Sequence, residues 1–163
     1  MFFRIQAVIT RAPENFQKKV IEVKEMFTND SSSFTNYRRH DMRTRLNLVA
    51  AAEAHVLWKT RLGRNLQEGA CEPLESVMVG QDGVCQLGGW ISGSVFEPFR
   101  ELDVYQRLSE SHRQFHELGR GIVEKLKVGD RGGAEAVFNN EYSLSLHGIV
   151  QSLTEINKLL QED

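Results

Sequence analysis

Tyr105–Leu126, YQRLSESHRQFHELGRGIVEKL, is the stretch that decides the fold. Its inward positions recur every three or four residues: Tyr105, Leu108, His112, Phe115, Gly119, Ile122 and Leu126. A stripe with this period follows one face of an α-helix and is typical of a helix that packs in a bundle. The stretch therefore predicts a long bundle helix.

Three other segments show the same spacing. They are residues 13–27, residues 48–66 and, after a predicted turn at Val128–Gly133, residues 138–160. A further short helix is predicted to begin near Cys85, after a long connection over residues 70–84. We predict an all-α fold, most simply an antiparallel four-helix bundle with this short extra helix. We expect residues 1–40 to form an N-terminal arm and helix, and residues 41–163 to form the bundle domain that carries the candidate site.

Composition limits the class of protein. The chain of 163 residues is long enough for one domain with a real core, and its net charge of −2 argues against nucleic-acid binding. It has no run of 18 apolar residues, which predicts no membrane span, and Met1–Thr10 makes a poor signal peptide. Two cysteines do not form a disulfide framework, so we predict a cytoplasmic protein.

Four side chains stand out as candidate metal ligands. His112 and His116 are four residues apart and share one helical face, while His55 lies on the apolar stripe of residues 48–66. Cys85 follows Gly83 at the predicted start of the short helix. Three imidazoles and one thiolate form a set of ligands that zinc prefers.

A structural interpretation of these residues stays open at this point. A buried histidine is more often a hydrogen-bonded core residue, a buried cysteine is more often inert, and H-x-x-x-H pairs are common by chance. Against this, three imidazoles buried without partners would cost several kcal/mol. A bound metal ion would remove that cost.

Other candidates carry less weight. The arginine cluster formed by Arg38, Arg39, Arg43 and Arg45 is either an anion or nucleic-acid patch or, as we favour, a solvated helix face. If the arginine cluster bound an anion or a nucleic acid, the binding affinity would depend steeply on salt concentration.

The remaining histidines, tryptophans and cysteine are assigned from their positions in the sequence. His40 and His147 are predicted to lie at the surface, and Trp58 and Trp90 to wall the candidate site. Cys71 is either a bystander, which we favour, or a second redox thiol for Cys85.

Three motifs resemble the chemoreceptor zinc-binding domain, a bacterial module found with chemoreceptors and diguanylate cyclases. They are His55-x-x-Trp58-Lys59, Cys85-Gln-Leu-Gly-Gly-Trp90 and His112-Arg-Gln-Phe-His116, within roughly residues 45–160. The resemblance implies a helical bundle whose Zn²⁺ is held by His55, Cys85, His112 and His116. The sequence departs from the family at Gly89, where a basic residue is more frequent. The resemblance also favours a stand-alone homodimer that signals to another protein, a chemoreceptor, a cyclase or similar.

The sequence argues against catalysis. Four protein ligands leave no open position on zinc, and Arg113 stands where an H-E-x-x-H protease has its glutamate. No glutamate stands three residues before any histidine, as a di-iron bundle requires. We therefore predict a sensory domain of chemotaxis or cyclic-di-GMP type that responds to zinc or oxidants. The alternative is a structural zinc protein that acts as an adaptor.

Overall fold

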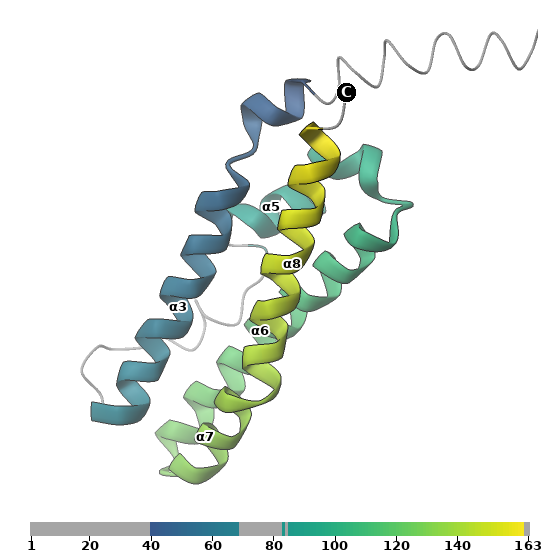
Figure 1. Ribbon diagram of the computed structural model, residues 1–163. Coiled ribbons are helices and arrows are strands. Elements are labelled where there is room, and N and C mark those ends of the chain that lie inside the picture. The colour runs from purple at the N-terminus through teal and green to yellow at the C-terminus, as the bar shows by residue number, and fades with distance from the viewer. Residues whose placement is uncertain (1–39, 69–82, 84, 162–163) are drawn as a thin grey trace, which may run out of the picture. The chain divides into compact units, whose positions relative to one another are not determined.

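Helices make up almost all of the described chain in the computed structural model, which covers residues 40–68, 83 and 85–161 (Figure 1). The account below concerns Met42–Asp163, one of two units into which the chain divides. Its elements are α3 (Leu48–Glu68), α5 (Gln86–Ser92), the 3-10 helix η2 (Ser94–Phe99), α6 (Asp103–Lys127), α7 (Arg131–Asn139) and α8 (Glu141–Gln161). These described residues contain no strand, which confirms the all-α class for this part of the chain.

The predicted helices over residues 48–66 and 105–126 are confirmed as α3 and α6. Asn47 caps the start of α3, because its side-chain oxygen accepts a hydrogen bond from the Ala50 amide at 3.0 Å. α6 ends at Lys127, and Gly129 just beyond it has a φ of +79°, in the left-handed region that glycine enters without strain. Both boundaries thus follow from local residue chemistry.

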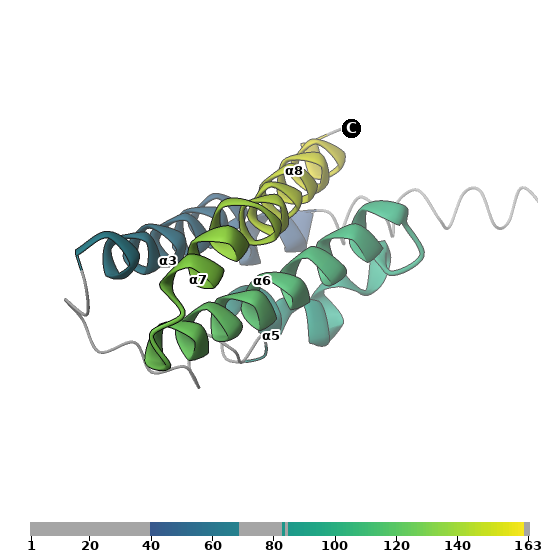
Figure 2. The same ribbon diagram turned by 90° about the horizontal axis from the view of Figure 1, so that it is seen from below.

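The three long helices lie side by side, and α8 runs antiparallel to α6 (Figures 1 and 2). Arg107 near the start of α6 pairs with Glu155 near the end of α8, at 2.6 Å. Further along, the Phe115 ring of α6 stacks on Tyr142, in the first turn of α8. This antiparallel arrangement follows from the short connections through α7, which reverse the chain direction.

The core lies between these helices and is completed by the segment from α5 to η2. Leu62 of α3, Leu108 and Ile122 of α6, and Ile149 and Ile156 of α8 are all buried. Phe96 and Phe99 of η2 are buried as well, at the end where Phe96 contacts the Tyr105 ring of α6. The inward positions predicted for the long helices therefore supply the core.

One predicted helix is divided in the structure. The segment 138–160 is interrupted at Asn140, whose φ of −102° and ψ of −96° are not helical. The turn predicted at Val128–Gly133 is shorter than expected, because Asp130 caps a separate helix, α7, by accepting a hydrogen bond from the Gly133 amide at 3.0 Å. α8 then begins at Glu141.

Two predictions about organisation are not decided by these elements. The helix expected over residues 13–27 lies outside the described residues, so the antiparallel four-helix bundle stays a prediction. The division into residues 1–40 and 41–163 stays a prediction for the same reason. Within the part of the chain that the structure describes, no helix is long and apolar enough to span a membrane.

The surface histidines are placed as predicted, since His40 and His147 are both exposed. In the arginine cluster, Arg38 and Arg39 lie outside the described residues. Arg43 is exposed, and its side chain donates a hydrogen bond to the Leu160 carbonyl in the last turn of α8. A cationic side chain at a helix C-terminus stabilises the helix, which gives Arg43 a structural role.

Candidate metal centre

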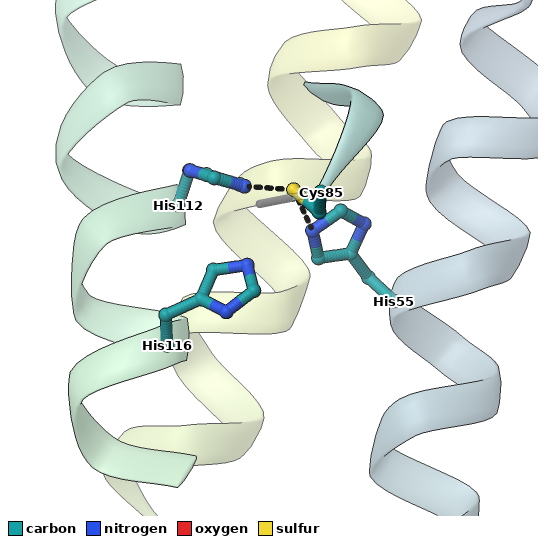
Figure 3. Close-up of side chains that lie close together, drawn as sticks. All are labelled: His55, Cys85, His112 and His116. Carbon is teal, nitrogen blue, oxygen red and sulfur yellow. Dashed lines mark hydrogen bonds between the residues drawn. The ribbon is translucent and has the colours of Figure 1, made fainter. Parts of the chain in front are cut away.

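Three elements bring the four predicted ligands to one place (Figure 3). His55 projects from the middle of α3, His112 and His116 from one face of α6, and Cys85 from the residue that precedes α5. Each offers one ligand atom, and these atoms all lie within 4.8 Å of one another. The three histidines are buried and Cys85 is half-buried.

The start of α5 fixes the cysteine. Cys85 is its N-cap residue, with extended backbone angles, and its Sγ accepts a hydrogen bond from the Gly88 amide at 3.2 Å. Leu87 is buried beside it, and the Tyr105 hydroxyl of α6 donates to the Ile91 carbonyl of α5 at 2.9 Å. The thiol therefore sits at the positive end of a helix that is tied to α6, a position that favours the thiolate.

A backbone carbonyl selects the tautomer of His55. Nδ1 lies 2.7 Å from the Ala51 carbonyl oxygen, which only accepts, so Nδ1 carries the proton. The neutral ring then has its lone pair on Nε2, which lies 3.9 Å from the Cys85 Sγ. This is the arrangement in which a metal-binding histidine donates its second nitrogen to an orienting acceptor.

The distances between the ligand atoms lie near those around a tetrahedral zinc ion. Bonds of about 2.0–2.3 Å place the ligand atoms of such an ion about 3.3–3.6 Å apart. In the structure the Cys85 Sγ lies 3.0 Å from His112 Nε2 and 3.9 Å from His55 Nε2, on either side of that range. Small side-chain movements would bring these atoms to the separations that zinc requires.

Burial favours the neutral form of two of the imidazoles, those of His112 and His55. Burial lowers the pKa of His112 to about 3, with added repulsion from His116 and His55. Burial also lowers the pKa of His55, against the opposing effect of its hydrogen bond to Ala51 and with further lowering from His116. Neutral nitrogen is the form that binds metal, so protons compete weakly for these two ligands.

No carboxylate joins this group within the described ranges. Arg113, between the two α6 histidines, is exposed and forms ion pairs with Glu110 at 2.8 Å and with Glu117 at 2.6 Å. These glutamates face solvent with their arginine. The group at the centre can thus bind a metal through nitrogen and sulfur, and it lacks the general base of a metalloprotease.

Two aromatic residues next to the site were given no role from the sequence. Phe115 lies edge-on to the His55 ring at 5.2 Å and to the His116 ring at 5.6 Å, and Tyr142 stacks behind it. The stripe on α6 signalled that Phe115 is inward, but it did not signal its contact with α3. Trp58 and Trp90 are half-buried against the core, and their role as walls stays a prediction. Cys71 lies outside the described residues.

The comparisons with known proteins agree with this geometry. Residues 55–123 match the family model of the chemoreceptor zinc-binding domain, a range that includes all four of these side chains. No curated protein and no solved structure matches the chain. The family is regulatory and zinc-binding, and it is not a catalytic family. Over residues 55–123 the chain is therefore similar to the chemoreceptor zinc-binding domain, a family whose cofactor is Zn²⁺, and His55, Cys85, His112 and His116 form a potential zinc site.

Proposed function

We propose that His55, Cys85, His112 and His116 hold one Zn²⁺ ion in a sensory site. The observation that carries the proposal is the grouping of three imidazole nitrogens and one sulfur within 4.8 Å, in a largely buried position. Zinc with four protein ligands has no open position for a substrate or a reactive water, so the proposed role is regulatory and not enzymatic.

Cys85 is the proposed input residue. Its sulfur is the one ligand of the set that an oxidant attacks readily. Hydrogen peroxide would transfer one oxygen atom to the thiolate, giving a sulfenate and water, and the modified sulfur would hold zinc more weakly. The same sulfur caps α5 through the Gly88 amide, so its loss from the metal would also disturb the start of α5. Zinc supply and oxidants are thus the two proposed inputs.

The proposed output is transmitted to another signalling protein in the cytoplasm. The family's description names chemoreceptors, which supports a role in chemotaxis with a chemoreceptor as partner. A role in cyclic-di-GMP signalling with a cyclase rests on the resemblance of the sequence motifs alone. A reducing compartment would keep the Cys85 thiolate available between oxidation events.

A second copy of the chain is the proposed partner at the surface formed by α3 and α8. A groove of about 490 Å³ between these helices is lined mainly by apolar side chains that include Ala52, Val56 and Val150. Val49 is 63% exposed and Leu57 is 55% exposed on the same groove. Large exposed apolar side chains grouped on one helix face are typical of a protein–protein contact, which supports a homodimer.

Sedimentation tests the proposed dimer. The wild type should sediment as a dimer, and Val56→Glu should dissociate it. Val128→Glu is the control, because Val128 is exposed away from this groove, and it should leave the dimer intact. A wild-type monomer would overturn the proposed homodimer.

The zinc content of the purified protein tests the sensory proposal. Native mass spectrometry is expected to show about one zinc per chain, released by an equimolar oxidant while the helical circular dichroism persists. Cys85→Ser should remove the oxidant response and Cys71→Ser should retain it. A response that survives Cys85→Ser would contradict the proposal, as would a wild-type protein without bound zinc.

The alternative function is a structural zinc protein that acts as an adaptor. The closed ligand set in a largely buried site is the observation that favours it. A structural ion would resist mild chelation or unfold the chain on leaving, whereas a sensory site should release zinc and stay folded. Circular dichroism during chelation separates the two functions.

A further inference from the structure

Phe115 contacts two ligands that belong to different helices. Its ring centroid lies 5.2 Å from that of His55 on α3, with an angle of 64° between the planes. It lies 5.6 Å from that of His116 on its own helix, with an angle of 84°. Both contacts are edge-on, a geometry in which the positive edge of one ring meets the negative face of the other.

The third long helix holds Phe115 in turn. The Tyr142 ring of α8 stacks on it, with a centroid distance of 4.5 Å and an angle of 20° between the planes. Tyr142 is completely buried and meets Phe138 of α7 at 5.8 Å. Phe115 is 1% exposed, so its ring has little room to reorient.

Ring orientation determines whether an imidazole can bind a metal. The lone pair on nitrogen lies in the ring plane, so a rotation of the ring turns the lone pair away from the ion. The hydrogen bond from His55 Nδ1 to Ala51 fixes one atom of that ring. The edge contact with Phe115 adds a constraint on its plane, and it does the same for His116.

We propose that Phe115, backed by the stacked ring of Tyr142, is a positioning residue that orients His55 and His116 for zinc. The inference rests on the proposed zinc ligation, and it names one structural cause of the site's affinity for zinc. α3, α6 and α8 each contribute one ring to this series, in which His55 meets Phe115 edge-on and Phe115 stacks on Tyr142. The preorganised rings would bind zinc without first losing rotational freedom.

Phe115→Leu tests this role, with Phe96→Leu as a matched control. Both phenylalanines are buried, and Phe96 contacts Phe99 and Tyr105 at the η2 end of the core. Competition with a chromophoric chelator should show zinc affinity reduced about tenfold or more in Phe115→Leu, the range seen when residues that orient metal ligands are removed. The visible spectrum of the Co²⁺-substituted protein should broaden or shift. Phe96→Leu should lower stability with little change in either metal measurement.

Tyr142 supplies an independent variant if Phe115→Leu does not fold. Tyr142→Leu should weaken zinc binding, whereas Tyr142→Phe should bind zinc as the wild type does, because the stacked ring is retained. Wild-type zinc affinity and Co²⁺ spectra in both leucine variants would overturn the proposal. So would equal losses in Phe115→Leu and Phe96→Leu.

A metal-free measurement separates this inference from the proposed function. Nitrogen NMR of the imidazoles in the chelated protein reports tautomer and ring motion. His55 and His116 are expected to show sharp, single-state signals in the wild type and averaged signals in Phe115→Leu, with Phe96→Leu resembling the wild type. A wild type that binds no zinc yet shows this pattern would overturn the zinc site while supporting the orienting role; unchanged imidazole signals would overturn the orienting role alone.

Discussion

The Sγ atom of Cys85 lies 3.0 Å from Nε2 of His112, although 26 residues separate them in the chain. The cysteine belongs to the start of α5 and the histidine to the middle of α6, so the contact depends on how these elements pack. Tyr105 secures that packing through its hydrogen bond to Ile91. Any change that separates α5 from α6 should therefore weaken zinc binding, because it moves Cys85 away from His112.

Removing one imidazole should remove the metal. We expect His112→Ala to lower bound zinc from about one equivalent per chain to a small fraction, since three ligands then remain. Elemental analysis after dialysis measures the change. His147→Ala is the control, because His147 is exposed on α8 and should retain the full equivalent. Full zinc content in the His112 variant would contradict the proposed ligand set.

The metal-free protein should lose stability as the pH falls below about 6.5. Burial lowers the pKa of His112 from 6.5 to about 3, so between these values the unfolded chain binds a proton that the folded chain excludes. Acidification through this window therefore favours unfolding, and above pH 6.5 this contribution to the pH dependence disappears. Urea unfolding of the chelated protein at several pH values measures it. His112→Gln should reduce the slope, and an unchanged slope would exclude His112 as its source.

Two tyrosines should respond oppositely to loss of their hydroxyl groups. The Tyr142 hydroxyl is buried without a hydrogen-bond partner among the described residues, and burial raises its pKa, so it stays neutral. Tyr142→Phe should leave the free energy of unfolding unchanged or raise it by up to about 1 kcal/mol. Tyr105→Phe removes the hydrogen bond to Ile91 and should lower that free energy by about 1 kcal/mol. Thermal unfolding of the pair provides the comparison; a large loss in Tyr142→Phe would reveal a partner for its hydroxyl.

Helices α6 and α8 approach closely at Gly148. A Cβ atom added there would lie 3.0 Å from the Cβ of Ser111. Gly148→Ala should therefore separate the helices and lower the free energy of unfolding by about 1–3 kcal/mol. Gly121→Ala is the control, because nothing lies within 4 Å of its added Cβ and alanine favours the helix by about 1 kcal/mol. Equal stability of the two variants would show that the Gly148 contact is not limiting.

Helix periodicity accounts for the success of sequence-based prediction here. The spacing of Leu108, His112 and Phe115 gives α6 and its inward face, and the same argument gives α3. It did not give the break at Asn140, because a single polar residue within a continuing stripe leaves the period unchanged. The four side chains of the candidate site could also be named in advance, since H-x-x-x-H and the cysteine motif are local patterns.

The sequence by itself determined the all-α class, the two long helices α3 and α6, and which histidines and cysteine face inward. These properties depend on residues within a few turns of one another. The tertiary structure alone decided that Cys85 reaches His112 and that Phe115 joins α3 to Tyr142 of α8. The physical reason is that these contacts join atoms on different helices, whose separation depends on close packing such as that at Gly148 and not on the local period.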